Sequence, residues 1–337
     1  MTRFPLRMTA ASTSSTPRSG EVAVLGAGVV GLTTALGLLD AGFPVLIYAR
    51  EKTPQLTSDV AAAIWLPYKV ESSERADAWA RRTRVLYEEM ERRGVPGIKS
   101  APLLMLTPAK KDPAALRILE PKVRDATAAE LPAGFATAPV FSVPRVETPV
   151  HMAWLQAEFA RRGGRFVTRS VERVQDLLTA HRIVVNCTGV GARTVAPDDG
   201  VYPIRGQLVL VSRPAGLDDT IILYDNGSTT YIVPRDRDCV LGGTAEAGEW
   251  STVPDPAVAN DIFDRCVRLR PVLATARVLG QRVGLRPARA AVRLELEPMP
   301  GGRAIVHNYG HGGAGFTLAW ACAETVLELV RAFPGGR

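Results

Sequence analysis

The chain has 337 residues, 46% of them hydrophobic, and a formal net charge of +7. A chain of this length can bury a large core and suggests two domains, or one domain with a large insertion. Its apolar runs fall short of the roughly 18 residues of a membrane-spanning helix. Its Arg and Lys residues do not cluster with aromatics, as they do in nucleic-acid-binding segments. We therefore predict neither a membrane nor a nucleic-acid partner.

Residues 1–20 contain many Ser and Thr, three arginines and no acidic residue. They lack the apolar core of a secretory signal, so we expect a flexible N-terminal tail. The four cysteines are far apart and form no C-x-x-C pair, which gives no redox or metal motif. This cysteine usage suits a reducing cytosol, and we expect a cytoplasmic protein.

The first predicted elements form a βαβ unit. Residues 21–25 are apolar, as in a buried parallel strand. Residues 29–41 are typical of a helix that ends at Gly42, and residues 43–48 form a second apolar strand. This unit indicates an α/β domain.

A G-x-G-x-x-G motif connects the first strand to the helix. Its glycines permit a tight turn, let a pyrophosphate approach the backbone and allow close helix–strand packing, while the helix N-terminus offers N–H groups to phosphates. Glu51 lies 20 residues after Gly31, where a carboxylate can bind ribose hydroxyls; Arg50 beside it can also meet a 2′-phosphate. The alternative is a glycine-rich turn that binds nothing. The predicted dinucleotide contacts are Gly26, Ala27, Gly28, Val29, Val30, Gly31, Arg50 and Glu51.

The middle of the chain contains both helical and strand periodicity. A helix over 151–162 and strands over 165–169 and 182–186 continue the first unit. Alternating strands, which predict an antiparallel sheet, occupy stretches such as 206–211, 230–234 and 240–243.

A second glycine-rich turn lies between a predicted strand over 303–307 and a predicted helix over 316–332. Thr317 can place its hydroxyl near the start of this helix. His307 and His311 lie in this region without a carboxylate cluster, so we predict no metal site. Two glycine-rich turns of this kind suggest one long ligand held at both ends. The glycines of the turn are Gly310, Gly312, Gly313 and Gly315.

The run from His307 to Thr317, HNYGHGGAGFT, resembles the signature of the D-amino-acid oxidase family, flavoproteins that include D-aspartate oxidase. The resemblance extends over about residues 20–332. Further family-like segments follow in order at residues 57–62, 65–68, 185–189, 205–207, 231–234, 241–244 and 284–287.

The resemblance implies an α/β fold, with a Rossmann-like FAD-binding domain and a second, mainly antiparallel-sheet substrate domain. The expected FAD-binding domain is discontinuous and comprises residues 20–68, 146–193 and 303–332. The expected substrate domain comprises residues 69–145 and 194–302. A homodimer is a further expectation at the level of the family.

With FAD as the cofactor, the resemblance also implies particular contacts, for each of which ordinary packing is the alternative. It places Thr57 and Ser58 near the pyrophosphate, Val171 and Thr188 near the adenosine half, and Ala63 and Ile64 along the flavin ring. A helix N-terminus aimed at the ring would stabilise the negative charge of the reduced flavin. The remaining predicted cofactor contacts are Ala62, Gly189, Gly312, Gly313, Gly315, Phe316 and Thr317.

The resemblance selects Arg286 as the residue that binds the substrate carboxylate. A planar guanidinium stays charged and binds a carboxylate through two hydrogen bonds. From the residues alone Arg286 can equally be a structural ion-pair residue, and Arg289 and Arg293 remain open. By resemblance, Tyr231 donates to the same carboxylate, and Tyr224, on a predicted turn, covers the pocket. The Gly313 carbonyl is expected to accept from the substrate amine.

The implied reaction is the FAD-dependent oxidative deamination of D-amino acids. A hydride passes from Cα to flavin N5, O2 reoxidises the flavin to give hydrogen peroxide, and the imino acid hydrolyses to a 2-oxo acid and ammonia. The motifs contain no dedicated general base, and solvent can take the amine proton. The expected partners are therefore a small D-amino acid and O2.

Neutral D-amino acids are the favoured substrates. A D-aspartate oxidase is the close alternative, but this chain has Ala245 and Glu246 after the Gly-Gly-Thr turn, where such relatives tend to place an arginine. Leu66, Ile222 and Val233 also look apolar at expected pocket positions, whereas Arg235 and Arg237 keep the alternative open. A glycine or sarcosine oxidase, an NAD(P)-dependent dehydrogenase and a non-catalytic flavin-binding protein are the other interpretations.

Overall fold

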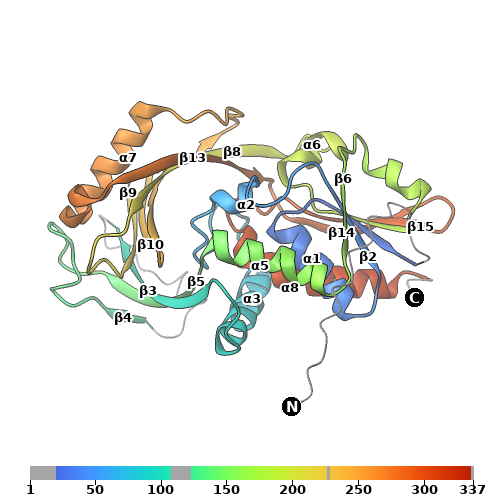
Figure 1. The fold of residues 1–337 in the computed structure, drawn as a ribbon, viewed down its shortest axis with the longest axis horizontal. Coiled ribbons are helices and arrows are strands. Elements are labelled where there is room, and N and C mark those ends of the chain that lie inside the picture. Colours follow the sequence, from blue (N-terminus) through green and yellow to red (C-terminus); the bar gives the residue numbers. More distant parts are fainter. Residues whose placement is uncertain (1–19, 108–122, 226–227, 335–337) are drawn as a thin grey trace, which may run out of the picture.

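The computed structural model describes residues 20–107, 123–225 and 228–334. Two sheets lie along the long axis of the molecule, and the first and last described segments share one half of it (Figure 1). The predicted N-terminal tail, apart from Gly20, lies outside the described residues, as do residues 226–227.

The first sheet has six strands in the order β14-β15-β7-β1-β2-β6, and only β14 runs antiparallel to its neighbour. Parallel strands covered on both faces are apolar throughout, and three of these strands are buried at every position. The strands are β1 (Val22–Leu25), β2 (Val45–Ala49), β6 (Arg165–Thr168), β7 (Ile183–Asn186), β14 (Arg293–Met299) and β15 (Arg303–Tyr309).

Helices cover both faces of this sheet. On one face α1 packs against α5 and α8, and α3 packs against α8; Figure 1 shows these helices close together. On the other face a 3-10 helix, η1, buries its apolar side chains against the strands. The bounds are α1 (Val29–Asp40), α3 (Glu74–Arg92), α5 (Thr148–Arg161), α8 (Gly315–Ala332) and η1 (Val174–Thr179).

Glycines flank both ends of helix α1. Gly28 is the extended residue before its first turn. At its end Gly42 has a φ of +89°, a left-handed conformation that favours glycine. The Gly42 amide donates to Leu39 and the Phe43 amide donates to Leu38, which satisfies carbonyls that a helix end otherwise leaves open.

The second sheet follows the order β12-β8-β11-β10-β9-β3-β5-β4, with β13 also paired to β8. Its pairs are antiparallel except β3 with β9. Its strands are β3 (Ile98–Leu106), β4 (Val123–Asp125), β5 (Pro139–Val146), β8 (Tyr202–Ser212), β9 (Thr220–Asp225), β10 (Ser228–Pro234), β11 (Asp238–Gly242), β12 (Glu246–Ala247) and β13 (Val278–Ala288).

Helix α7 (Pro256–Leu269) packs on this sheet. Asp255 caps it by accepting from the amides of Ala257 and Val258, and Pro256 occupies its first turn. Its buried residues recur at helical spacing and are Ala259, Ile262, Cys266 and Leu269. The short elements of the chain are α2 (Thr57–Val60), η2 (Gly189–Gly191), α6 (Ala192–Val195) and η3 (Pro271–Thr275).

The predicted α/β fold with a second, mainly antiparallel sheet is confirmed. Two segments from the predicted substrate blocks lie instead with the first sheet, because β14 pairs with β15 and α3 packs on α8. We propose that the two-domain division holds with these segments assigned to the first domain. In the described ranges, no helix is both long and apolar enough to cross a bilayer.

Candidate active site

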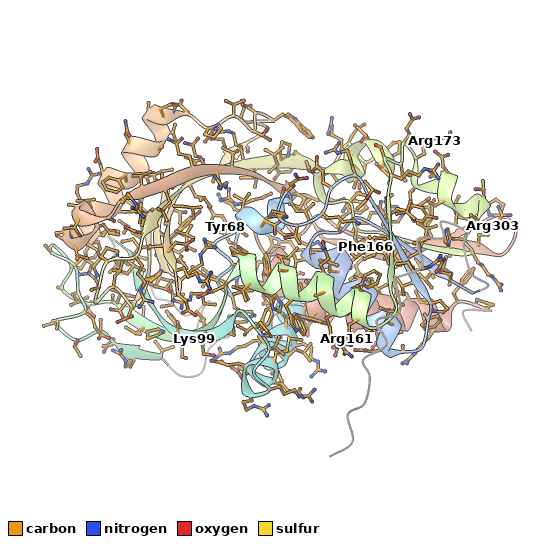
Figure 2. The ribbon with its side chains drawn as sticks, viewed as in Figure 1. Tyr68, Lys99, Arg161, Phe166, Arg173 and Arg303 are labelled. Atoms are coloured by element: carbon orange, nitrogen blue, oxygen red, sulfur yellow. The ribbon has the colours of Figure 1, made fainter. Side chains whose placement is uncertain are left out.

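A cavity of about 1250 Å³ is lined by residues of both sheets. Its volume exceeds the roughly 300–1,000 Å³ of a typical small-ligand pocket, so it can hold a dinucleotide and a substrate together. Tyr68, one of its lining residues, lies near the middle of the molecule (Figure 2). In the described part of the chain, no group of three or more His, Cys, Asp or Glu residues can hold a metal ion.

The upstream glycine turn lies at one wall of the cavity and is closely packed. Gly26 has a φ of +112°, and a Cβ on it would lie 2.4 Å from the Cys187 carbonyl oxygen. A Cβ on Gly31 would lie 2.0 Å from the Gly26 carbonyl oxygen. Gly31 is not among the lining residues, so its part is to let the helix approach the turn.

The N-terminus of α1 faces the cavity through Gly28, Val29 and Val30. A helix leaves its first N–H groups without intrahelical partners, which makes this end a site for phosphates. The Val29 amide donates to Ser58 Oγ at 3.0 Å, so the Ser58 hydroxyl can itself donate toward the cavity. Ser58 and Thr57, both predicted near the pyrophosphate, line the cavity.

The predicted adenosine-side residues all line the same cavity. Glu51 follows β2, and its carboxylate lies 3.3 Å from Arg50 in an exposed pair. The Thr188 hydroxyl donates to Asn186 Oδ1 at 2.7 Å, which fixes the turn after β7. The residues of this group are Arg50, Glu51, Val171, Thr188 and Gly189.

The downstream glycine turn is held by segments from elsewhere in the chain. The Gly312 amide donates to Pro287 at 2.7 Å, and the Gly313 amide donates to Tyr68 at 3.0 Å. Gly312 has a φ of +56°, and a Cβ on it would lie 1.8 Å from the Lys69 carbonyl oxygen. The turn therefore requires glycine both for its backbone conformation and for its packing.

Helix α8 brings a second N-terminus to the cavity, through Gly315 and Phe316. Thr317 does not line it. The Thr317 side chain is buried; its hydroxyl donates to the Leu66 carbonyl at 2.9 Å, and the Leu66 amide lies 3.3 Å from the same oxygen. Thr317 thus anchors the segment that carries Ala62, Ala63 and Ile64, which do line the cavity.

Arg286 has the geometry of an anion-binding residue. Its Nη1 donates to the carbonyls of Thr244 and Arg205 at 3.0 and 3.4 Å, and its guanidinium lies 5.6 Å from the Tyr68 ring centroid. A Cβ on Gly206 would lie 2.2 Å from Nη1, so glycine there makes room for the group. No carboxylate of the described residues pairs with Arg286, so the N–H groups that do not contact these carbonyls or the Tyr231 phenol are left for a ligand.

The other two arginine candidates are engaged elsewhere. Arg289 donates to Asp198 at 3.0 Å, and Arg293 donates to Glu295 at 2.7 Å. Neither lines the cavity. The geometry therefore favours Arg286 among the three.

Tyr231 and Tyr224 both line the cavity, and the Tyr231 phenol lies beside Arg286. Tyr231 lies on β10 opposite Ile222, and burial raises the pKa of its phenol. The prediction of a turn at Tyr224 is wrong: this residue lies on β9 opposite Thr229, because strand pairing continues to the end of the hairpin. Burial also raises the pKa of Tyr224.

Arg235 and Arg237, which on sequence grounds left a D-aspartate oxidase as the alternative, do not line the cavity. The Arg235 side chain is 5% exposed and pairs with Asp238 at 2.6 Å. Neither Arg235 nor Arg237 is a lining residue, and Val233 also lies away from the cavity, contrary to expectation. Leu66 and Ile222 line it as predicted.

Several lining residues received no role from the sequence. Tyr68 lies in a family-like segment, yet only its contacts with Arg286 and Gly313 show its position. His311, expected only to be a structural or flavin-neighbour histidine, lines the cavity and is buried, which lowers its pKa to about 4. Further lining residues without a predicted role are Thr229, Trp250 and Arg282.

The fold and this cavity, with two helix N-termini and a glycine turn at each, define an α/β protein that can hold a dinucleotide. Residues 21–329 match the family model described as DAO, FAD dependent oxidoreductase, and the chain belongs to this family. The predicted family membership and the FAD cofactor are thereby confirmed. The closely packed glycines and the helix N-termini fit FAD, which the residues named above would hold.

The chain is 45% identical to a D-amino-acid oxidase of Streptomyces coelicolor, over 93% of this chain and 97% of that protein. It is 33% identical to a D-aspartate oxidase of Homo sapiens, over 93% and 95%. The structure resembles glycine oxidase from Geobacillus kaustophilus with a TM-score of 0.79 at 22% identity, covering 93% of this chain and 95% of that one. This structural likeness shows the shared fold.

Proposed function

We propose that the protein catalyses the FAD-dependent oxidative deamination of neutral D-amino acids, giving 2-oxo acids, ammonia and hydrogen peroxide. The observation that carries the proposal is Arg286, a cavity-lining guanidinium without a carboxylate partner among the described residues and with Tyr231 and Tyr68 beside it. The relatives named D-amino-acid oxidase at 43–45% identity support the same reaction.

The protein's own contribution is to bind and orient the substrate. Arg286 binds the carboxylate through two hydrogen bonds, and Tyr231 donates to it. The Gly313 carbonyl accepts from the amine, while its amide is already used by Tyr68. With both groups fixed, one enantiomer presents its Cα hydrogen to the cofactor. FAD held by the residues named above would supply the hydride acceptor and the route of the electrons to O2.

The preference for neutral side chains follows from the charges around the cavity. The lining includes the apolar residues Leu66, Leu208 and Ile222, of which Ile222 lies opposite Tyr231. Arg282, another lining arginine, is four residues before Arg286 on β13, about 13 Å along an extended strand. A second substrate carboxylate beside Arg286 would therefore be desolvated without a cationic partner, which is costly.

The test is peroxide release by the purified yellow protein with matched D- and L-amino acids. Turnover of neutral D-amino acids, with D-aspartate at least tenfold poorer in kcat/KM, supports the proposal. Equal or better turnover of D-aspartate would move the assignment to a D-aspartate oxidase, and turnover of L-amino acids would contradict it.

We further propose a cytoplasmic location and a homodimer. The four free cysteines are all buried, which suits a reducing compartment. Sedimentation of the purified protein tests the homodimer, and a monomer at micromolar concentration would contradict it.

A further inference from the structure

The loop between β12 and α7 is held in place from beneath by two buried side chains of β8. Arg205 is 4% exposed and donates to the carbonyls of Ser251 at 2.9 Å and Val253 at 2.8 Å. Gln207 is fully buried and exchanges hydrogen bonds with the backbone of Asp255, at 2.7 and 2.9 Å. Backbone groups at three positions of one loop are thus fixed by side chains of the sheet.

Burying these polar side chains costs free energy unless they are hydrogen-bonded, and their hydrogen bonds hold the loop in one conformation. A buried charge requires partners. Besides the two loop carbonyls, Arg205 donates to the Glu246 carboxylate at 3.0 and 3.1 Å and to Gln207 Oε1 at 3.0 Å. Gly248 adds a further link, because its amide donates to Pro203 at 2.8 Å. The loop is therefore pre-organised by the sheet below it.

The fixed loop presents Trp250, which is 48% exposed and lines the cavity together with Thr252. A series of contacts connects the loop of Trp250 to the turn after β7. Gly248 contacts Pro203, Pro203 pairs with Pro287 across β8 and β13, and a Cβ on Gly189 would lie 3.7 Å from Pro287. A half-exposed indole thus stands at the rim near the turn after β7.

The same three-residue segment of β8 also supports Arg286. The Arg205 carbonyl accepts from Arg286, and Gly206 makes room for its guanidinium. The Gln207 amide donates to the Thr244 hydroxyl at 3.0 Å, and the Thr244 carbonyl accepts from Arg286. The segment Arg205–Gln207, to which the sequence assigned no role, therefore connects the loop to the anion-binding residue.

We propose that Trp250 is a cofactor-binding residue, whose indole packs on bound FAD at the rim of the cavity, and that Arg205 and Gln207 hold it there. The proposal rests on FAD binding by this cavity. An aromatic ring supplies a large apolar face that covers a flat ligand at little entropic cost. The loop then acts as a fixed wall that slows the loss of the cofactor.

The experiment measures the rate at which FAD leaves the holoprotein on dilution, followed by flavin fluorescence. Trp250→Ala is expected to release FAD about tenfold faster than the unchanged protein, and Trp250→Phe within about twofold of it. Val253→Ala is the matched control, because Val253 lies in the same loop, is 71% exposed and does not line the cavity. Release from Trp250→Ala as slow as from Val253→Ala would overturn the proposal.

A second variant tests whether Arg205 holds Trp250 in place. Arg205→Lys keeps the charge but loses the forked donors, so it should also speed FAD release severalfold. In Arg205→Lys with Trp250→Ala the effects should not add, because both act on one contact. Fully additive effects would contradict the role given to Arg205. These rates are measured without substrate, so a failure to oxidise D-amino acids would leave the result intact and would overturn only the proposed reaction.

Discussion

The upstream and downstream glycine turns face the same cavity but are held in different ways. The upstream turn packs against its own sheet, through Cys187 at the end of β7. The downstream turn depends on Tyr68, Lys69 and Pro287, residues from the connection after α2 and from β13 of the second sheet. The first turn is thus a local feature of one domain, whereas the second joins the cofactor wall to the substrate end.

Substitutions at the two turns should therefore have different effects on FAD and substrate binding. A defect upstream should weaken FAD binding and leave the substrate geometry alone. A defect downstream should disturb both, because the Tyr68 carbonyl holds the turn and the Tyr68 ring lies beside Arg286.

The largest effect is expected from replacing Gly312. In Gly312→Ala the new Cβ would overlap the Lys69 carbonyl and force an alanine into a left-handed backbone. We expect loss of bound flavin and of all turnover, measured by absorbance and peroxide assay. Gly37→Ala is the control, since its Cβ would make an ordinary 3.8 Å contact from α1 to α8. A yellow, active Gly312→Ala protein would refute the packing argument.

Gly28→Val tests the local turn. The new Cβ would lie 3.2 Å from Ser58 Oγ, and the rest of the side chain would enter the space beside that hydroxyl and block the phosphate approach. We expect flavin retention to be lost while the apoprotein keeps its melting cooperativity. Tight FAD binding by this variant, measured by ultrafiltration, would be evidence against the phosphate cradle.

Arg286→Ala separates substrate binding from cofactor binding. Removing a charge-assisted pair should lower kcat/KM for D-amino acids, which corresponds to a rise of about 2–5 kcal/mol in the activation free energy. FAD should still be bound. Arg237→Ala, an exposed arginine away from the cavity, should stay within about twofold. Unchanged kcat/KM in Arg286→Ala would remove this residue from the site.

Glu51→Gln should affect the cofactor end alone. Loss of a charged acceptor for ribose hydroxyls should weaken FAD binding by about 1.5–3 kcal/mol, with KM for the substrate unchanged at saturating FAD. A raised KM with unaltered FAD affinity would contradict the separation of the two ends.

The last expected effect concerns pH and falls on the downstream turn, since the upstream residues 26–31 carry no titratable side chain. Burial lowers the pKa of His311 to about 4, from about 6.5 when unfolded. The unfolded state therefore binds more protons between these values, and stability should fall as the pH drops through that window, by up to about 1.4 kcal/mol per pH unit. His311→Gln should reduce this slope in urea titrations at pH 5 and 7; an unchanged slope would rule out His311.

The sequence predicted what depends on local pattern. The βαβ unit and its glycine turn follow from short-range periodicity and spacing, whereas the two-domain fold class also needed the alternating strands and the family resemblance. The turn predicted at Tyr224 is wrong because its conformation depends on the β9–β10 pairing, and the hydrogen bond of the Thr317 hydroxyl to Leu66 likewise depends on a distant partner. Trp250 carried no signal at all, since only the buried contacts of Arg205 show that its loop is fixed at the cavity.

The most direct test of the account is anaerobic mixing of the holoprotein with D-alanine, and separately with L-alanine, while flavin absorbance is recorded. We predict rapid bleaching with the D enantiomer, none with the L enantiomer, and recovery of the yellow colour with release of peroxide when air is admitted. A flavin that stays oxidised with D-alanine and other neutral D-amino acids, or that bleaches equally with both enantiomers, would contradict it.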